Sequence, residues 1–264
     1  MRSLFILLAT VSLAACGGES GGTTGVGSGT AQGPSSTPSP TPTPSATPSP
    51  SPSPSASPTP SQGTPPGGDG KIVVVTEGSS SAFAYGGNHT GMYRDYKGSA
   101  IEFHGLAVGG SGLNNLIDRI DVVLVAKPDL VSVYIGANDL TSYSSADAFA
   151  SRLQSYVEQI RRTGAKVVIC TILPRQTGSA HDARYNAMRK EVAEIIRKVD
   201  WVDGVVDFAN DPQMGPDDAP FNRVLYKTDG VHPTDGSKAN PPSGQMVLFE
   251  AYRPIMDKLL ADVR

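Results

Sequence analysis

The chain has 264 residues and a formal net charge of −3 at pH 7, so no overall positive field favours a nucleic-acid partner. Its two cysteines, Cys16 and Cys170, cannot build a disulfide framework or a cysteine-rich metal site. Cys170 lies in an apolar run over residues 167–173, which predicts a small buried side chain rather than a reactive thiol.

The first fifteen residues have the features of an export signal. Arg2 supplies a positive charge, an apolar stretch follows, and two small residues come just before Cys16. The apolar stretch is too short to span a bilayer comfortably. Residues 1–15 are therefore predicted to be a signal peptide.

Residues 13–16 read Leu-Ala-Ala-Cys and resemble the lipobox of bacterial lipoproteins. The resemblance implies cleavage before Cys16, acylation of Cys16, and stable anchoring by several acyl chains. Gly17 stands where a retention signal would have aspartate, which implies the outer membrane of a Gram-negative cell envelope. The alternative is an ordinary signal peptide in which the cysteine stands by chance.

Residues 16–70 are expected to form a disordered linker. They are first rich in Gly, Ser and Thr and then repeat proline between residues 38 and 60, with no periodic apolar pattern. Such a segment has nothing to bury and cannot offset its ordering entropy. A spacer between membrane and folded domain is favoured over a proline-rich ligand, because the repeat is monotonous and lacks flanking charges.

Residues 71–264 are predicted to form one folded domain, in which β-branched runs alternate with helical patterns of apolar residues. This alternation predicts a parallel five-stranded sheet covered by helices on both faces. The predicted strands are 71–76, 101–108, 130–135, 167–173 and 204–208, and the predicted helices cover 113–124, 149–160, 185–199 and the chain from about 243.

Small and polar residues follow the first three predicted strands. The strands are followed by Gly-Ser-Ser at 78–80, Gly-Gly-Ser-Gly at 109–112 and Gly-Ala-Asn-Asp at 136–139. Asp229 and His232 precede the last helix. Ligands of parallel sheets bind at the carboxyl ends of the strands, so we expect all four groups at one edge of the sheet.

These residue types suit acyl transfer. A carboxylate three residues before a histidine can accept the Nδ1–H and leave Nε2 free as a base, as Asp229 and His232 are spaced to do. A serine that follows a strand can supply a nucleophilic Oγ, and glycine N–H groups and an asparagine amide can bind a developing oxyanion.

In this order the residues resemble the SGNH/GDSL hydrolase family, whose fold is a three-layer α/β/α, flavodoxin-like α/β fold. The resemblance implies Ser80 as nucleophile, His232 as base and Asp229 as the residue that orients it. It also implies an oxyanion hole made of the Ser80 N–H, the Gly110 N–H and the Asn138 amide. No metal or cofactor is expected.

The first block of the family usually reads Gly-Asp-Ser, whereas this chain has Gly78-Ser79-Ser80. The register therefore stays open: Ser79 or Ser81 is an alternative nucleophile, and Gly109 is an alternative to Gly110.

The other histidines are expected to have structural rather than catalytic roles. His104 lies on a predicted strand and is expected near the core, while His89 and His181 are expected in polar loops. No histidine spacing indicates a metal site. Arg175 follows the fourth strand and is expected to be a solvated loop residue, although it points toward the same edge.

The sequence thus predicts an exported, lipid-anchored serine esterase, expected to be a monomer. The expected substrates are small acyl esters, among them O-acetyl groups on carbohydrate. One alternative is an acyltransferase that uses the same site with a sugar as acceptor. Another is a non-catalytic glycan-binding lipoprotein, which would not require a complete set of serine, glycine, asparagine, aspartate and histidine.

Overall fold

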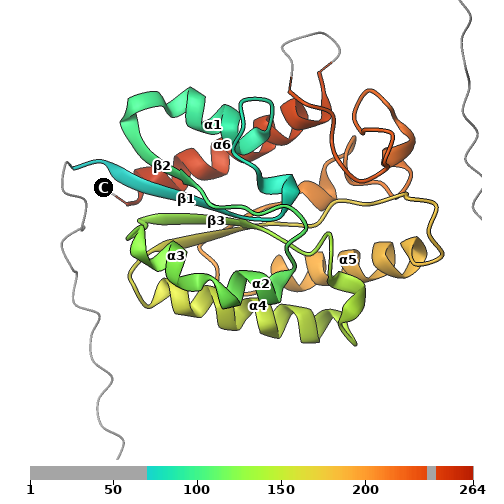
Figure 1. The fold of residues 1–264 in the computed structure, drawn as a ribbon, viewed down its shortest axis with the longest axis horizontal. Helices are drawn as coiled ribbons and strands as arrows, with labels where there is room; N and C mark the ends of the chain where they lie inside the picture. Colours follow the sequence, from blue (N-terminus) through green and yellow to red (C-terminus); the bar gives the residue numbers. More distant parts are fainter. Residues whose placement is uncertain (1–69, 237–241, 264) are drawn as a thin grey trace, which may run out of the picture. The chain divides into compact units, whose positions relative to one another are not determined.

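The computed structural model describes residues 70–236 and 242–263 (Figure 1). The predicted signal peptide, Cys16 and the linker up to residue 69 lie outside the described residues. None of the helices in the described part of the chain is both long enough and apolar enough to cross a membrane.

The core of the domain is a five-stranded parallel sheet, as predicted, and its strand order is β2-β1-β3-β4-β5. All residues of β1 and β3 are buried, which explains their continuous apolar runs, whereas the edge strands β2 and β5 are partly exposed. The strands are β1 (Ile72–Gly78), β2 (Ile101–Gly105), β3 (Leu130–Tyr134), β4 (Lys166–Cys170) and β5 (Gly204–Val206).

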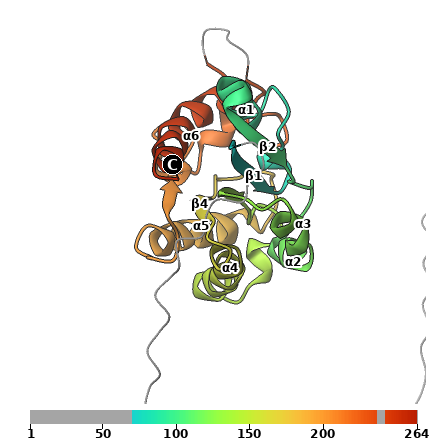
Figure 2. The same cartoon turned by 90° about the vertical axis from the view of Figure 1, so that its left-hand side faces the viewer.

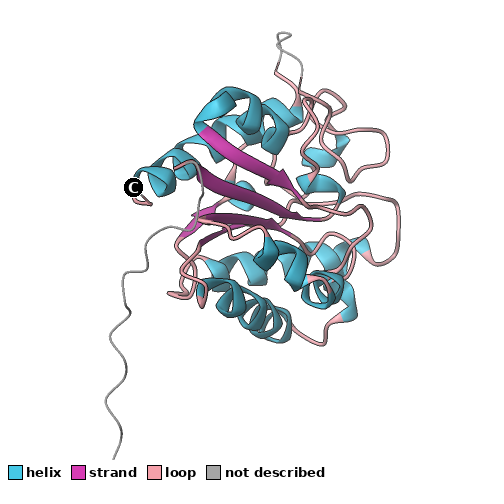
Figure 3. Ribbon diagram, turned by 60° about the vertical axis from the view of Figure 1, so that its left-hand side comes forward, coloured by secondary structure: helices cyan, strands magenta, loops and turns pink. Residues whose placement is uncertain are grey.

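Helices cover both faces of the sheet and complete the predicted three layers (Figures 2 and 3). One face packs against α1 (His89–Lys97) and α6 (Gly244–Ala261). The other face packs against α2 (Leu113–Asp118), α3 (Ile120–Val125), α4 (Ala146–Arg161) and α5 (Asp182–Ile196). The side chains of Asn88, Ser145 and Ser243 cap α1, α4 and α6 by accepting a backbone N–H in the first turn.

The structure departs from the predicted helices at two places. The single helix predicted over 113–124 is divided at Arg119, whose backbone leaves the helical region (φ −113°, ψ 20°). The Arg119 side chain turns back into the interior and hydrogen-bonds there. No range was predicted for α1, because the first three residues that it buries are a histidine, a threonine and a glycine.

The strand order creates a topological switch point at the carboxyl ends of β1 and β3, the kind of position where ligands of parallel sheets bind. The chain runs from β1 to the edge strand β2 and then crosses back over β1 to β3, so the winding direction reverses between these two neighbours. Gly78 at the end of β1 is paired with Tyr134 at the end of β3. The loops that carry Ser80 and Asn138 therefore leave the sheet side by side.

Candidate active site

The turn that carries Ser79 and Ser80 begins at Gly78, the last residue of β1. Its φ is +146°, and a Cβ at this position would lie 2.1 Å from the carbonyl oxygen of Tyr134. Only glycine fits both the backbone conformation and this close approach. A short 3-10 helix, Ser80–Ala82, follows and directs the chain away from the sheet.

Of the three adjacent serines, Ser80 is the one that the structure brings to the histidine. Its Oγ lies 2.8 Å from Nε2 of His232. Ser79 is 1 % exposed and its buried Oγ makes no hydrogen bond with the described residues, and Ser81 is also buried. The geometry thus favours Ser80, the nucleophile that the family resemblance implied, over Ser79 and Ser81.

The carboxylate of Asp229 contacts the other ring nitrogen of His232. Its Oδ2 lies 2.8 Å from Nδ1 of His232, and its Oδ1 accepts the backbone N–H groups of Val231 and His232 at 2.8 and 2.9 Å. Burial raises the pKa of Asp229, but these backbone N–H groups and the imidazole outweigh that effect and lower it overall. An ionised acceptor at Nδ1 requires the proton there, which leaves Nε2 to accept the Ser80 hydroxyl proton.

Gly230 fixes the course of the loop between these two residues. Its φ is +67°, and a Cβ would lie 1.9 Å from the carbonyl oxygen of Gln176. Gln176 also donates its N–H to the Gly230 carbonyl at 2.8 Å, and the Lys227 N–H donates to the His232 carbonyl at 2.7 Å. The loop is therefore fastened to the neighbouring segment by its backbone.

The predicted oxyanion residues lie at the same edge. Gly110 has a left-handed backbone (φ +76°) with open space at its Cβ position, whereas Gly109 faces the ring of Phe83. Within the described residues, no acceptor is bound to the N–H of Ser80 or of Gly110. The Asn138 amide donates one hydrogen to the Ser111 carbonyl at 2.9 Å, which leaves its second hydrogen for a ligand.

A buried ion pair beneath the site was not recognised from the sequence. Arg119 binds the carboxylate of Glu77, donates to the Gly78 carbonyl at 3.2 Å and donates to Ser111 Oγ at 2.8 Å. It thereby joins the turn at Gly78 to the loop at residues 109–112, which carries Gly110. Burial raises the pKa of Glu77, and the Arg119 guanidinium acts against that rise. The signal available in the sequence was Glu77, a charged residue at the end of a predicted buried strand of β-branched residues.

Asp139 is a second residue whose role the sequence did not reveal. Its Oδ2 accepts the backbone N–H of Leu113 at 2.6 Å, and a Cβ on Gly112 would lie 2.7 Å from its carboxyl carbon. Asp139 therefore holds the loop at residues 109–112 against the loop that carries Asn138. Its place next to Asn138, directly after a buried strand, was the available signal.

Two side chains outside the site differ from expectation. His89 does not lie in a polar loop: it is the first residue of α1, is fully buried, and its Nδ1 lies 2.9 Å from Gln245 Oε1. Arg175 is not solvated either, since it stacks over the Tyr185 ring at 4.1 Å and pairs with Asp182 at 3.1 Å. Both belong to the packed structure around the site rather than to its surface.

The remaining residues lie on the expected elements. His104 lies on β2, but this is an edge strand, and its 35% exposed side chain bonds to Glu102 rather than packing near the core. His181 is exposed just before α5, as expected. Cys170 is a buried free thiol, and burial raises its pKa to about 12.

Solved structures share this fold. A GDSL-like lipase from Bacteroides thetaiotaomicron matches with a TM-score of 0.53 at 16% identity, over 76% of this chain and 93% of its own. The psychrotrophic esterase EstA from Pseudoalteromonas sp. matches with a TM-score of 0.51 at 16% identity, over 72% of this chain and 100% of its own. LAE5, an α/β hydrolase from the Lake Arreo metagenome, matches with a TM-score of 0.51 at 17% identity, over 71% and 96%. These likenesses show that the chain shares its three-layer fold, a parallel sheet between layers of helices, with these proteins.

The family is shown by the match of the sequence to a family model. A model of the GDSL-like lipase/acylhydrolase family matches residues 75–236, which is more than half of the chain. The chain belongs to this family and is a carboxylic ester hydrolase of the SGNH type. No curated protein sequence matches it.

Proposed function

We propose that the protein is a serine esterase in which Ser80, His232 and Asp229 form the catalytic triad. The observation that supports this assignment is the pair of 2.8 Å contacts that connects Ser80 Oγ through the His232 ring to Asp229 Oδ2. Ser80 and His232 lie 152 positions apart in the sequence, and a polar surface turn would not need to bring them together.

In the proposed reaction, His232 Nε2 takes the Ser80 proton as Oγ attacks the ester carbonyl carbon. The carbonyl oxygen becomes an oxyanion and receives hydrogen bonds from the Ser80 N–H, the Gly110 N–H and the Asn138 amide. His232 then gives its proton to the departing alcohol, which leaves an acyl group on Ser80. Water, deprotonated by His232, releases the acid and restores the serine.

The proposed substrates are small acyl esters, with O-acetyl groups on carbohydrate as one class. Membership of an acylhydrolase family supports the ester, and the polar residues that surround Gly110 and Asn138 support a hydrophilic substrate.

Steady-state hydrolysis of p-nitrophenyl acetate tests the triad. Ser80→Ala and His232→Ala should each lower kcat by about 10⁴-fold or more, because the members of a triad act as a unit. Ser79→Ala is the matched control, since the Ser79 hydroxyl has no hydrogen-bond partner in the described structure. Activity that survives in Ser80→Ala but is lost in Ser79→Ala would contradict the assignment.

We further propose that Cys16 is lipidated and holds the protein at the outer membrane of a bacterial envelope, with the proline-rich linker as a spacer. The support is the Leu-Ala-Ala-Cys sequence at residues 13–16 after an apolar stretch. Cys16→Ser should move the protein from the membrane fraction to the soluble fraction, while Cys170→Ser should not. A Cys16→Ser protein that stays with the membrane would contradict the anchor.

A further inference from the structure

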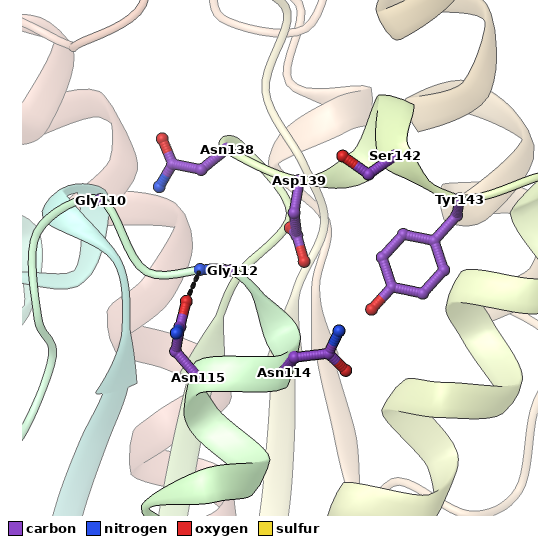
Figure 4. Close-up of a pocket in the computed structure, with 8 residues that line it drawn as sticks. All are labelled: Gly110, Gly112, Asn114, Asn115, Asn138, Asp139, Ser142 and Tyr143. Atoms are coloured by element: carbon purple, nitrogen blue, oxygen red, sulfur yellow. Dashed lines mark hydrogen bonds between the residues drawn. The ribbon is translucent and has the colours of Figure 1, made fainter.

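A cavity of about 370 Å³ lies beside the proposed oxyanion hole (Figure 4). It shares Gly110 and Asn138 with that hole and extends between the start of α2 and the loop that follows β3. Ser80 and His232 are not part of its lining. A group bound there would belong to the same substrate, but to a part away from the reacting carbonyl.

Most of the residues that line the cavity have polar side chains, although the surface that they expose to it is only slightly more polar than apolar. Three asparagines, an aspartate and a serine contribute, and the ring of Tyr143 is the largest apolar surface among the lining residues. No aliphatic side chain lines it, so an alkyl chain would gain little burial and would strip water from amides. The cavity therefore suits a ligand with hydrogen-bonding groups of its own.

The amides at the start of α2 are oriented by the protein. Arg152 Nε donates to Asn114 Oδ1 at 3.2 Å, and the Gly112 N–H donates to Asn115 Oδ1 at 2.9 Å. With both oxygens engaged, each amide keeps its NH₂ group for a ligand acceptor. These two side chains are exposed and within reach of a bound molecule.

Two further polar atoms at the cavity lack partners among the described residues. They are Asp139 Oδ1 and the Tyr143 hydroxyl, both shielded from solvent. In Figure 4 the Tyr143 hydroxyl points toward Asn114. Burial raises the pKa of Tyr143, and the neighbouring Asp139 charge raises it further. An unpaired buried carboxylate oxygen and hydroxyl are costly unless a ligand supplies their hydrogen bonds.

We propose that this cavity is a sugar subsite, which binds a hydroxyl-rich ring of an acylated carbohydrate while its ester carbonyl occupies the oxyanion hole. Amide NH₂ groups and a carboxylate oxygen match a ring hydroxyl, which both accepts and donates, and the Tyr143 ring can pack against the C–H face of a sugar. The inference rests on the proposed function, because it uses the same nucleophile and oxyanion hole.

Two acetate esters that differ only in the alcohol test the subsite. 6-O-acetylglucose carries free hydroxyls and p-nitrophenyl acetate carries none, yet both give the same acetyl-enzyme. The quantity to measure is the ratio of kcat/KM for the sugar ester to kcat/KM for the aryl ester. This ratio should fall about tenfold in Asn114→Ala and in Tyr143→Phe, since each loses about one hydrogen bond to the sugar. Tyr96→Phe, at an exposed tyrosine on α1, is the control and should keep the parent ratio.

The outcomes separate the subsite from the proposed function. A ratio that stays at the parent value in both Asn114→Ala and Tyr143→Phe overturns the subsite. So does a parent enzyme that cleaves the aryl ester but not 6-O-acetylglucose, although the triad then stands. A folded parent that cleaves neither ester overturns the proposed function and the subsite with it. Asn114 is exposed, so its variant tests the subsite even where Tyr143→Phe unfolds the loop.

Discussion

The serine half of the site and the histidine half are held in place by different means. Ser80 follows a fully buried strand, and the carboxylate beneath it, Glu77, is 0% exposed. The side chains of His232 and Asp229 are 37% and 46% exposed, in a segment with little regular structure between β5 and α6. The first half is fixed by the packing of the sheet, and the second by hydrogen bonds within one short loop and from that loop to Gln176. Removing a side-chain partner should therefore mainly destabilise the fold in the first half and mainly impair the chemistry in the second.

The largest effect is expected from Asp229→Asn in the exposed half. The asparagine amide can donate to Nδ1 and so favour the wrong histidine tautomer, which should lower kcat by about 10⁴-fold. Because the side chain is half-exposed, the free energy of unfolding should change by less than about 1 kcal/mol. Kinetics and urea unfolding of the same preparation measure both. A fall in stability that parallels the fall in kcat would contradict the division between the halves.

The next largest effect is expected from Arg119→Met in the buried half. Glu77 would lose its partner while still buried, which should cost about 4 kcal/mol in the free energy of unfolding. Adding Glu77→Gln should restore much of that stability. Arg253→Met, which breaks an exposed pair with Glu250 on α6, is the control and should lower the free energy of unfolding far less. Equal costs for the two arginines in urea unfolding would show that the buried pair is not needed.

Acid should destabilise the fold through His89, which is buried among Tyr134, Phe208 and Tyr252. Burial lowers the pKa of His89 to about 4, while the Gln245 hydrogen bond acts in the other direction. In the unfolded chain His89 binds a proton at a higher pH than in the folded chain. The free energy of unfolding should therefore fall as the pH drops from about 6.5 toward 4, by up to about 3 kcal/mol. The dependence of unfolding on pH should be weaker in His89→Gln and unchanged in His181→Gln, a control at an exposed histidine. Identical pH dependence in parent and His89→Gln would refute this origin.

A smaller effect is expected from Gly230→Ala, which strains the histidine loop. Its left-handed backbone costs about 1–3 kcal/mol for a residue with a Cβ, and that Cβ would also meet the Gln176 carbonyl. The displaced His232 should lower kcat/KM by about 30-fold. Gly98→Ala is a matched control, with a similar φ of +54° but open space around it. It should lower stability without changing kcat/KM, and a comparable loss of activity in both variants would contradict the role of the loop.

The sequence contained enough to predict the sheet and the meeting of its loops. The β-branched runs predicted the five strands, and their alternation with helices predicted that the strands are parallel. The polar residues after three of the strands predicted that these residues meet at one edge of the sheet. Strand ends were less predictable: the run at 167–173 continues beyond β4, which stops at Cys170. The reason is that apolar residues past the end of a strand can be buried by loops as well as by neighbours in a sheet.

What the sequence did not reveal depends on contacts between distant positions. Arg119 stands within an apolar helical pattern, and only the folded structure shows that it turns inward to Glu77 and breaks the helix. His89 looked like a loop residue because its partner, Gln245, is 156 positions away. Likewise, three consecutive serines cannot be distinguished by pattern. The direction of the turn after Gly78 decides which of them faces the histidine.

The most direct test of the central claim is to locate the adduct formed by a serine-directed fluorophosphonate with tandem mass spectrometry. The fragment ions should place the phosphonyl group on Ser80, and labelling should be lost in both Ser80→Ala and His232→Ala. An adduct on Ser79 or Ser81 of the parent, or labelling of His232→Ala at the parent rate, would contradict the account.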